Sequence, residues 1–317
     1  MALNHREVAA FLAVARAGGV GAAAKSLSLS QPAITRSLKR LERQLGVALF
    51  VRHSTGMEMT PFGRTLIPYA ESLESETERI LEEISVLNGA AAGLARVGIV
   101  PSVAANLLPQ AIARTLAASP GVQVRVVEAT GNQLVSALIR GELDFAVAGL
   151  PHDPIDGHVL VSPLLEDEVT IVARAGHALM GERSLSVAKL REYPWAMPER
   201  GNVIWAGFHT MFQRAGLETP RAAVSANSVH TLKSIVGSTD FLTMLARVTI
   251  SLEERSGLLA TLDLAEGRWR RRLGVLRRAT GSLLPAASLL LSEIRNLATP
   301  LSSPDAAHFT EAWARKY

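Results

Sequence analysis

Residues 27–52 contain the pattern that most constrains the fold of this chain. Four apolar residues recur at the spacing of one buried helical stripe: Ile34, Leu38, Leu41 and Leu45. Ser30 is a favourable N-cap, and Pro32 lies in the first turn, where its missing N–H costs nothing. Gly46 is typical of the residue that ends a helix. The pattern predicts an amphipathic helix between Ser30 and Gly46.

The opposite face of this predicted helix is polar and basic. It carries Gln31, Thr35, Arg36, Lys39 and Arg43. These side chains offer donors that suit base edges in a DNA major groove and charges that suit phosphates. Taken alone, the charge pattern is more typical of an ordinary solvated face, so the neighbouring segments must decide between the two interpretations.

Two helical segments precede the basic helix. Residues 3–17 have a helical period that Gly18-Gly19 interrupts, and residues 20–27 form a short Ala-rich stretch. Ser28-Leu29 then leaves room only for a tight turn. Three helices with a short turn before the third predict a helix-turn-helix.

A pair of short strands is predicted directly after the basic helix. Leu49-Phe50-Val51 and Met57-Glu58-Met59 lie on either side of His53-Ser-Thr-Gly56. This arrangement predicts a two-stranded wing.

The order and spacing of these residues closely resemble the DNA-binding domain of the LysR-type transcriptional regulators. The matching residues are Ser30-Gln31-Pro32-Ala33-Ile34-Thr35-Arg36, Leu41-Glu42, Leu45-Gly46, Leu49-Phe50, Arg52, Thr60 and Gly63. The match runs over about the first seventy residues, and the rest of the chain resembles the effector-binding domain of the family more loosely. Gly19 and Ala22 depart from the Ser and the polar or basic residue usual in the family, which affects contacts with the DNA backbone.

The resemblance implies seven DNA-contacting residues: Gln31, Pro32, Thr35, Arg36, Lys39, Arg43 and Arg52. Gln31, Thr35 and Arg36 are predicted to read bases. Lys39, Arg43 and Arg52 are predicted mainly to hold phosphates. The distribution of charge agrees with this, because residues 1–60 hold eight Lys and Arg against three Asp and Glu, although the whole chain has a net charge of only +4.

Composition excludes several other classes of protein. The chain of 317 residues has no Cys, so it has neither disulfides nor thiolate metal sites, which fits a reducing compartment. Asn4-His-Arg-Glu7 interrupts any apolar signal segment, and no apolar run of 18 residues occurs. We therefore expect a cytoplasmic protein with no membrane partner, no metal site and no cofactor.

A long helix is predicted from Thr60-Pro61 to about Asn88-Gly89, which is roughly 40 Å at 1.5 Å per residue. Its apolar residues follow a near-heptad spacing: Leu66, Ala70, Leu73, Ile80, Ile84 and Leu87. The stripe could pack within its own domain, but its length and the acidic opposite face favour pairing with a second copy. The resemblance also implies a dimerising linker helix here. Pro68 is expected to kink it.

The remainder of the chain predicts a two-lobed α/β domain. Gly89 to Gly93 is expected to form a hinge. The next segments alternate between strands and helices: 97–100, 106–118, 122–127, 132–140 and 143–148. This order predicts a parallel sheet.

Val169 to Ala173 begins a second set, with a strand at 241–245 and helices at 185–193, 205–215 and 229–236. Residues 273–276 could return to the first lobe, before a helix at 286–298. The pattern resembles the periplasmic-binding-protein fold of LysR-type regulators.

The predicted fold is therefore an α+β multidomain chain. Residues 1–60 form a winged helix-turn-helix, 61–89 a linker or dimerisation helix and 90–317 the effector-binding domain. Lobe 1 covers about 90–165 and 268–300, and lobe 2 about 166–267. Residues 302–317 receive no assignment.

Ligands of such folds bind at the carboxyl ends of strands, where helices begin. Three junctions of this kind occur: Ser102, Thr130-Gly131-Asn132 and Asn227-Ser228. Each could be a plain N-cap, and the resemblance singles out Ser102 as an effector contact. Gly131 stands where the family usually has Ser or Thr. The effector contact at this position would therefore come from the backbone or from Thr130.

The resemblance places the wall of the second-lobe pocket at Asn202, Ile204 and Trp205. Trp205 suits a core position and an aromatic ligand equally well. Ser238-Thr239-Asp240 replaces a Gly-x-Gly common in the family, which would make this pocket unusually polar. His152 is expected to be exposed.

The sequence therefore predicts a regulator that binds double-stranded DNA at an interrupted palindrome. Its predicted small-molecule partner is an anionic effector, which could be aromatic. We also expect it to pair with a second copy through the linker helix, and two such dimers to form a tetramer. RNA polymerase is a further candidate partner. An enzyme or a solute-binding protein is the alternative, but no catalytic or nucleotide-binding motif occurs. A solute-binding protein would have no use for a helix-turn-helix.

Overall fold

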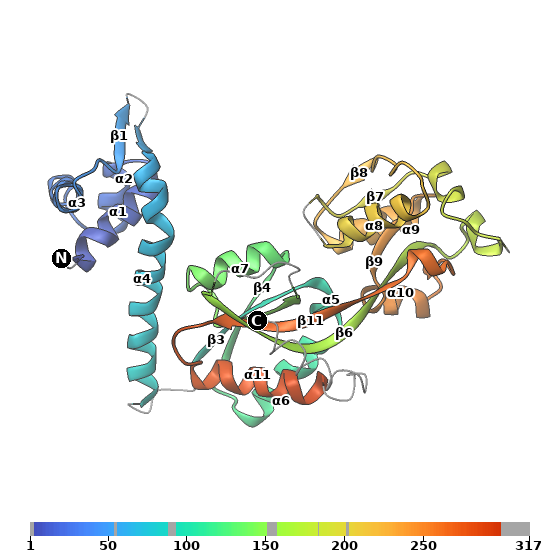
Figure 1. Cartoon of the computed structure of the whole chain (residues 1–317). Coiled ribbons are helices and arrows are strands. Elements are labelled where there is room, and N and C mark those ends of the chain that lie inside the picture. The colour runs from blue at the N-terminus through green and yellow to red at the C-terminus, as the bar shows by residue number, and fades with distance from the viewer. Residues whose placement is uncertain are drawn as a thin grey trace. The chain divides into compact units, whose positions relative to one another are not determined.

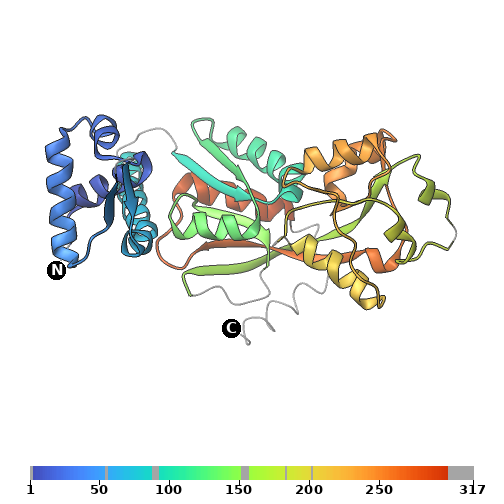
Figure 2. The same cartoon turned by 90° about the horizontal axis from the view of Figure 1, so that it is seen from above.

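The computed structural model describes residues 3–53, 56–87, 93–150, 157–182, 184–200 and 203–298. The predicted hinge (apart from Gly93), His152, Asn202 and the segment 302–317 lie outside these residues. The chain forms two compact units (Figures 1 and 2). The first comprises residues 1–91 and 136–143, and the second comprises 92–135 and 144–317.

The first unit begins with three helices and a two-stranded ribbon, as the sequence predicted. These are α1 (His5–Ala17), α2 (Val20–Ser26), α3 (Gln31–Leu45), β1 (Phe50–His53) and β2 (Gly56–Met59). Their core is built around large side chains with almost no exposed surface, including Phe11, Leu12, Ile34, Leu41 and Leu49. Three helices that share one apolar core set the exposed face of α3 in a defined orientation.

Local backbone chemistry explains where these helices begin and end. The Ser30 side chain accepts a hydrogen bond from the Ala33 N–H, so Ser30 caps α3 as predicted. Gly18 and Gly46 end α1 and α3 with φ of 67° and 73°, a left-handed conformation that glycine adopts without strain. Ser28, in the turn between α2 and α3, has φ 54°.

The long helix α4 (Pro61–Leu87) follows β2. The backbone of its first turn lies against Leu49, the residue before β1: a Cβ on Gly63 would come within 2.4 Å of the Leu49 carbonyl oxygen. Thr60 caps the helix by accepting a hydrogen bond from the Gly63 N–H. Gly63 is therefore required for this close approach.

The apolar stripe of α4 divides into two parts. Leu66 and Ala70 pack against the helix-turn-helix core. Leu73, Ile80 and Ile84 are about half exposed in the single chain. The prediction that the whole stripe faces a second copy is therefore wrong for its first part, because those residues complete the core of their own domain.

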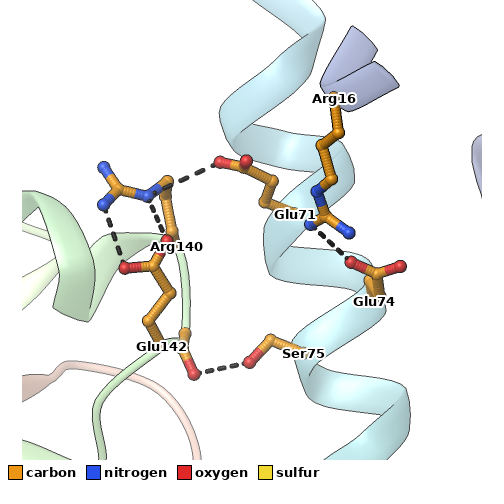
Figure 3. A network of polar contacts seen from close by, with 7 residues as sticks. Arg16, Glu71, Glu74, Ser75, Arg140 and Glu142 are labelled. Carbon is orange, nitrogen blue, oxygen red and sulfur yellow. Dashed lines mark hydrogen bonds and ion pairs between the residues drawn. The ribbon is translucent and has the colours of Figure 1, made fainter. Parts of the chain in front are cut away.

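Polar contacts join α4 to other parts of the first unit (Figure 3). Arg16 of α1 donates to Glu74 at 2.7 Å. The Nε of Arg140 lies 2.7 Å from Glu142 and 3.5 Å from Glu71, and the hydrogen bond to Glu142 raises the pKa of Arg140 above its ordinary value. These pairs are partly exposed, so each contributes little to stability by itself.

The second unit is organised around a seven-stranded sheet with the strand order β10-β6-β11-β5-β3-β4, with β9 also paired to β6. Its strands are β3 (Leu94–Ile99), β4 (Gln123–Glu128), β5 (Phe145–Gly149), β6 (Val159–Arg174), β9 (Thr243–Ala246), β10 (Leu259–Thr261) and β11 (Trp269–Arg278). Strand β3 pairs in parallel with β4 and β5, as predicted, while β6 and β11 are antiparallel.

The first lobe consists of β3, β4, β5, the helices α5 (Pro101–Ala105), α6 (Leu107–Ala118) and α11 (Pro285–Ala298), and the start of α7 (Gly131–Ile139), whose residues from 136 onward fall in the first unit. α6 and α11 lie side by side along the sheet (Figure 1). Sheet strands buried on both sides explain why Phe145 to Ala148 are wholly apolar.

The second lobe contains the remaining elements: β7 (Ala196–Met197), β8 (Val224–Ser225), α8 (Val203–Arg214), α9 (Val229–Ser238), α10 (Ser251–Arg255) and the short 3-10 helices Ala178–Gly181 (η1), Lys189–Glu192 (η2), Arg247–Ile250 (η3) and Ala265–Gly267 (η4). An aromatic cluster of Trp195, Phe208 and Phe212 fills its core.

Strands β6 and β11 join the lobes. Their pairing runs from Val169 opposite Trp269 to Val159 opposite Arg278, with one register shift between Leu273 and Gly274. A Cβ on Gly274 would come within 2.3 Å of the Leu150 side chain, so this position accepts only glycine without rearrangement.

One predicted element is wrong, and another is longer than predicted. Residues 185–193 form only the one-turn helix η2, because Ser186, Val187 and the following Pro194 are all unfavourable to a longer helix. The strand expected from Val169 begins at Val159, since pairing with β11 extends it. Helix α5 was not predicted.

Candidate DNA-binding and effector-binding sites

The polar face of α3 lies opposite its buried stripe. Gln31, Pro32, Arg36, Lys39 and Arg43 are exposed, and Thr35 is half-buried. Ile34, Leu38 and Leu41 are buried on the other side. The donors and charges of α3 are therefore available to a nucleic acid, on a helix held rigidly by its apolar side.

The start of α3 lies close to α2. The Gln31 amide nitrogen would be 3.3 Å from a Cβ placed on Gly21, so the side chain lies over that glycine. The wing adds Arg52, which is exposed on β1 beside the contact between His53 and Glu58 at 3.3 Å. The predicted DNA-contacting residues thus come from α3 and from β1 of the same compact unit.

Ser102 is the predicted effector contact with the most distinctive surroundings. It lies on α5, directly after β3, and is only 5% exposed. Its Oγ accepts a hydrogen bond from Nη2 of Arg271 at 3.0 Å. Arg271 also donates from Nε and Nη2 to the two carboxylate oxygens of Asp167, at 2.5 and 2.7 Å. Sequence reasoning did not identify Arg271 or Asp167.

A sequence signal for this pair exists in hindsight. Residues 166–168 are all acidic and 270–272 are all Arg, and the two runs face each other across β6 and β11 with Asp167 directly opposite Arg271. Only this central pair is well buried, with side chains 8% and 11% exposed. The flanking pair Arg270 and Glu166 is more exposed, at a separation of 3.9 Å.

Two hydrogen-bond donors at the start of α7 find their acceptor within the same helix. Both the N–H and the hydroxyl of Thr130 donate to the Gln133 side-chain oxygen, at 3.0 and 2.9 Å. The bond from the Thr130 N–H to Gln133 is one half of a capping box, while the Thr130 hydroxyl binds the same side chain instead of the Gln133 N–H. Asn132 is exposed, and no atom lies within 4 Å of a Cβ placed on Gly131, so crowding does not explain the glycine.

The second lobe contributes Ile204, Trp205 and Asn227. Ile204 is 7% exposed within the core of that lobe. Trp205 packs against Phe208 with ring centroids 5.4 Å apart, and the Arg200 guanidinium lies 5.4 Å from its ring. The Asn227 amide donates to Glu199 at 2.7 Å. Among the described residues no hydrogen bond joins Ser102, Thr130 and Asn227 directly.

Within the described residues, no group of three or more His, Asp or Glu side chains is arranged to hold a metal ion. In the same part of the chain no single helix is long and apolar enough to cross a membrane; α1 and α2 together reach that length and composition but are bent by 117°.

Comparison with known proteins explains this combination of units. The LysR substrate binding domain matches residues 88–299, and the bacterial regulatory helix-turn-helix domain of the LysR family matches residues 5–64. The chain belongs to the LysR family of transcriptional regulators. Its fold is accordingly an N-terminal helix-turn-helix domain followed by a C-terminal LysR substrate-binding domain.

Similar regulators cover most of the chain. The HTH-type transcriptional regulator GalR of Pseudomonas putida is 30% identical over 87% of this chain and 69% of its own length. The SDS degradation transcriptional activation protein of a Pseudomonas species is 30% identical over 90% of this chain and 93% of its own. These LysR-family relatives are transcriptional regulators by name.

Solved structures share the fold, among them CbnR, a LysR family transcriptional regulator. CbnR in complex with its target DNA has a TM-score of 0.67 at 20% identity, over 93% of this chain and 100% of that one. ArgP from Mycobacterium tuberculosis has a TM-score of 0.69 at 19% identity, over 93% and 97%. At this level of identity the likeness concerns the fold alone.

Proposed function

We propose that this LysR regulator reads an interrupted palindrome in double-stranded DNA as a homodimer, that two dimers form a tetramer, and that a small anionic effector controls it. The observation that carries the proposal is the two-sided α3, with Ile34 and Leu41 buried and Arg36, Lys39 and Arg43 exposed. A rigid helix with an exposed row of donors fits a major groove.

The second half of α4 supports the dimer. Leu73, Ile80 and Ile84 are 47%, 51% and 50% exposed, and they lie 7 and 4 residues apart on one helix. An exposed apolar stripe of this spacing is the seam of a helix pair. Two heads joined along α4 would recognise two half-sites, which is why the proposed operator is a palindrome.

The effector proposal rests on Ser102. Its hydroxyl lies next to a charged pair at the junction of the crossing strands with the first lobe, and hydroxyl and guanidinium donors suit a carboxylate or sulfonate. The family membership of the substrate-binding domain favours ligand binding over catalysis. The proposal has three further parts. The effector can be aromatic and would then contact Trp205. The regulator contacts RNA polymerase, and it is located in the cytoplasm.

Selection from duplexes with a random central region tests the DNA part. The full chain should enrich an inverted repeat with a constant spacing between its halves. The variant Arg36→Ala should enrich the repeat less strongly. Enrichment of a single unrepeated site, or of no sequence at all, would contradict the proposal.

A thermal-shift screen of aliphatic and aromatic acids on the full chain tests the effector part. Each acid is compared with its neutral amide. Stabilisation by one acid and not by its amide is expected, because only the acid supplies the oxyanion. Equal stabilisation by an acid and its amide would favour a neutral effector instead.

A further inference from the structure

Three segments that are distant in the sequence meet at Arg271. Ser102 comes from α5 in the first lobe, Asp167 from β6 and Arg271 from β11. All three side chains are close to nine-tenths buried or more. α5 also packs against η3, which belongs to the second lobe. The cluster therefore lies where the first lobe, the crossing strands and the second lobe come together.

The hydrogen bonds among these three residues do not use all of their donors. Asp167 engages Nε and Nη2 of Arg271, and Ser102 accepts from Nη2. The two N–H groups on Nη1 take no part in these bonds, and neither does the proton of the Ser102 hydroxyl. A guanidinium edge beside a hydroxyl donor is the arrangement that binds an oxyanion through charge-assisted hydrogen bonds.

We propose that Arg271 is the charge-recognition residue of the effector site, binding an oxyanion of the effector on Nη1 together with the Ser102 hydroxyl, and that Asp167 is an internal counter-charge that weakens this binding. The proposal rests on the proposed effector function of the domain. A carboxylate, a sulfonate or a phosphate would supply the same oxygen chemistry. Without Asp167, an approaching anion would meet a full positive charge in a poorly solvated place.

Asp167 and Arg271 could instead serve only to hold β6 and β11 together. In that case the loss of either partner would strand the other as a buried charge, and both variants would be less stable without any difference in anion binding. The anion-binding role predicts opposite signs. Asp167→Asn should bind an oxyanion more tightly, while Arg271→Gln should lose it.

Inorganic sulfate is the probe, because it is small and does not require knowledge of the effector. Thermal unfolding of the full chain is measured in sodium sulfate and in sodium chloride of equal ionic strength. Arg270→Gln is the matched control, since Arg270 is the neighbouring residue on β11 with a largely exposed side chain (72%). Its response measures the general effect of sulfate on protein stability.

After the shift of the unfolding temperature in Arg270→Gln is subtracted, the shift that sulfate causes in Asp167→Asn should correspond to binding about tenfold tighter than in wild type. Arg271→Gln and the double variant Asp167→Asn with Arg271→Gln should show none. The double variant keeps a neutral hydrogen-bonded pair, so it replaces Arg271→Gln if that variant fails to fold.

An equal response in all variants, a response retained without Arg271, or no gain in Asp167→Asn would each overturn the proposal. Failure here is distinguishable from failure of the proposed function. Stabilisation of the wild-type chain by one acid and not by its amide would still stand, and the effector would then be recognised without Arg271.

Discussion

The carboxylate of Glu42 on α3 accepts a hydrogen bond from the backbone N–H of Leu49 at 2.8 Å, and the same oxygen lies 3.4 Å from the Phe50 nitrogen. Glu42 thus connects the helix that carries the DNA-binding face to the start of the wing. Leu49 itself is fully buried, so its N–H has no access to bulk water.

Glu42→Ala should lower the free energy of unfolding of the helix-turn-helix domain by about 1–3 kcal/mol, because a buried N–H loses its acceptor. Thermal unfolding of the full chain measures this. Glu58→Ala is the matched control, since Glu58 is an exposed carboxylate on β2. Equal stability of the two variants would show that Glu42 does not hold the wing.

Arg36→Ala should weaken binding to the selected DNA site by about 1–3 kcal/mol and reduce the preference for it over random DNA. Lys39→Ala should weaken binding to all sequences alike and flatten the dependence of affinity on salt. Fluorescence anisotropy with both DNAs at several salt concentrations separates the two effects. An unchanged preference in Arg36→Ala would remove it from the base-reading set.

Leu73→Asp combined with Ile80→Asp should dissociate the proposed dimer, because both side chains would place charges in its apolar interface. Sedimentation should show smaller species, and affinity for an inverted repeat should fall. Glu76→Lys on an exposed position between them is the control. Persistence of the full assembly in the double variant would assign its interface to another surface.

Ser102→Val should reduce effector affinity by about 1–3 kcal/mol, since it deletes the donor while roughly keeping the shape. Ser102→Thr keeps the hydroxyl and should bind more tightly than Ser102→Val. Calorimetry with the acid found by the thermal-shift screen decides this, and DNA binding without effector should be unaffected. Equal affinities of wild type and Ser102→Val would remove Ser102 from the site.

Lys233 and Glu253 in the second lobe should make stability depend on pH. Burial raises the pKa of Glu253, but the hydrogen bond and charge of Lys233, 2.7 Å away, contribute to holding it below its ordinary value of 4.5. A carboxyl with a lowered pKa in the folded state stabilises the protein above its ordinary pKa, and this contribution disappears as the pH falls through the folded value.

The stability difference between wild type and Lys233→Met should therefore be full at pH 6 and shrink toward pH 3. Denaturant unfolding at a series of pH values measures it. Lys189→Met removes a more exposed pair with Glu182 and should show a smaller difference. A difference for Lys233→Met that does not change with pH would contradict the role of Glu253.

The helix-turn-helix could be predicted in detail because its determinants are local. Ser30, Gly46 and the stripe from Ile34 to Leu45 act within one helix, and the two ends of α3 followed from them almost to the residue. The parallel strands β3, β4 and β5 were also predictable, since alternating strands and helices permit few arrangements.

The length of β6 could not be predicted because it depends on a distant partner, whereas the helix expected at 185–193 failed for the local reasons given above. The first half of β6 is a strand because β11 pairs with it, more than a hundred residues later. The same separation hides the contact of Asp167 with Arg271, and no local period could connect them. Whether Ser102, Trp205 and Asn227 contact an effector stays a prediction.

The ten-residue pairing of β6 with β11 has a mechanical consequence. A continuous ladder of hydrogen bonds contains no free joint, and its one irregular point is the step at Leu273 and Gly274. Any rotation of one lobe against the other must be taken up as torsion along this ribbon, most easily at that step. The elastic energy stored in the twisted ribbon would increase with the angle of rotation. It would favour the return of the lobes to their original orientation once the cause of the rotation is removed.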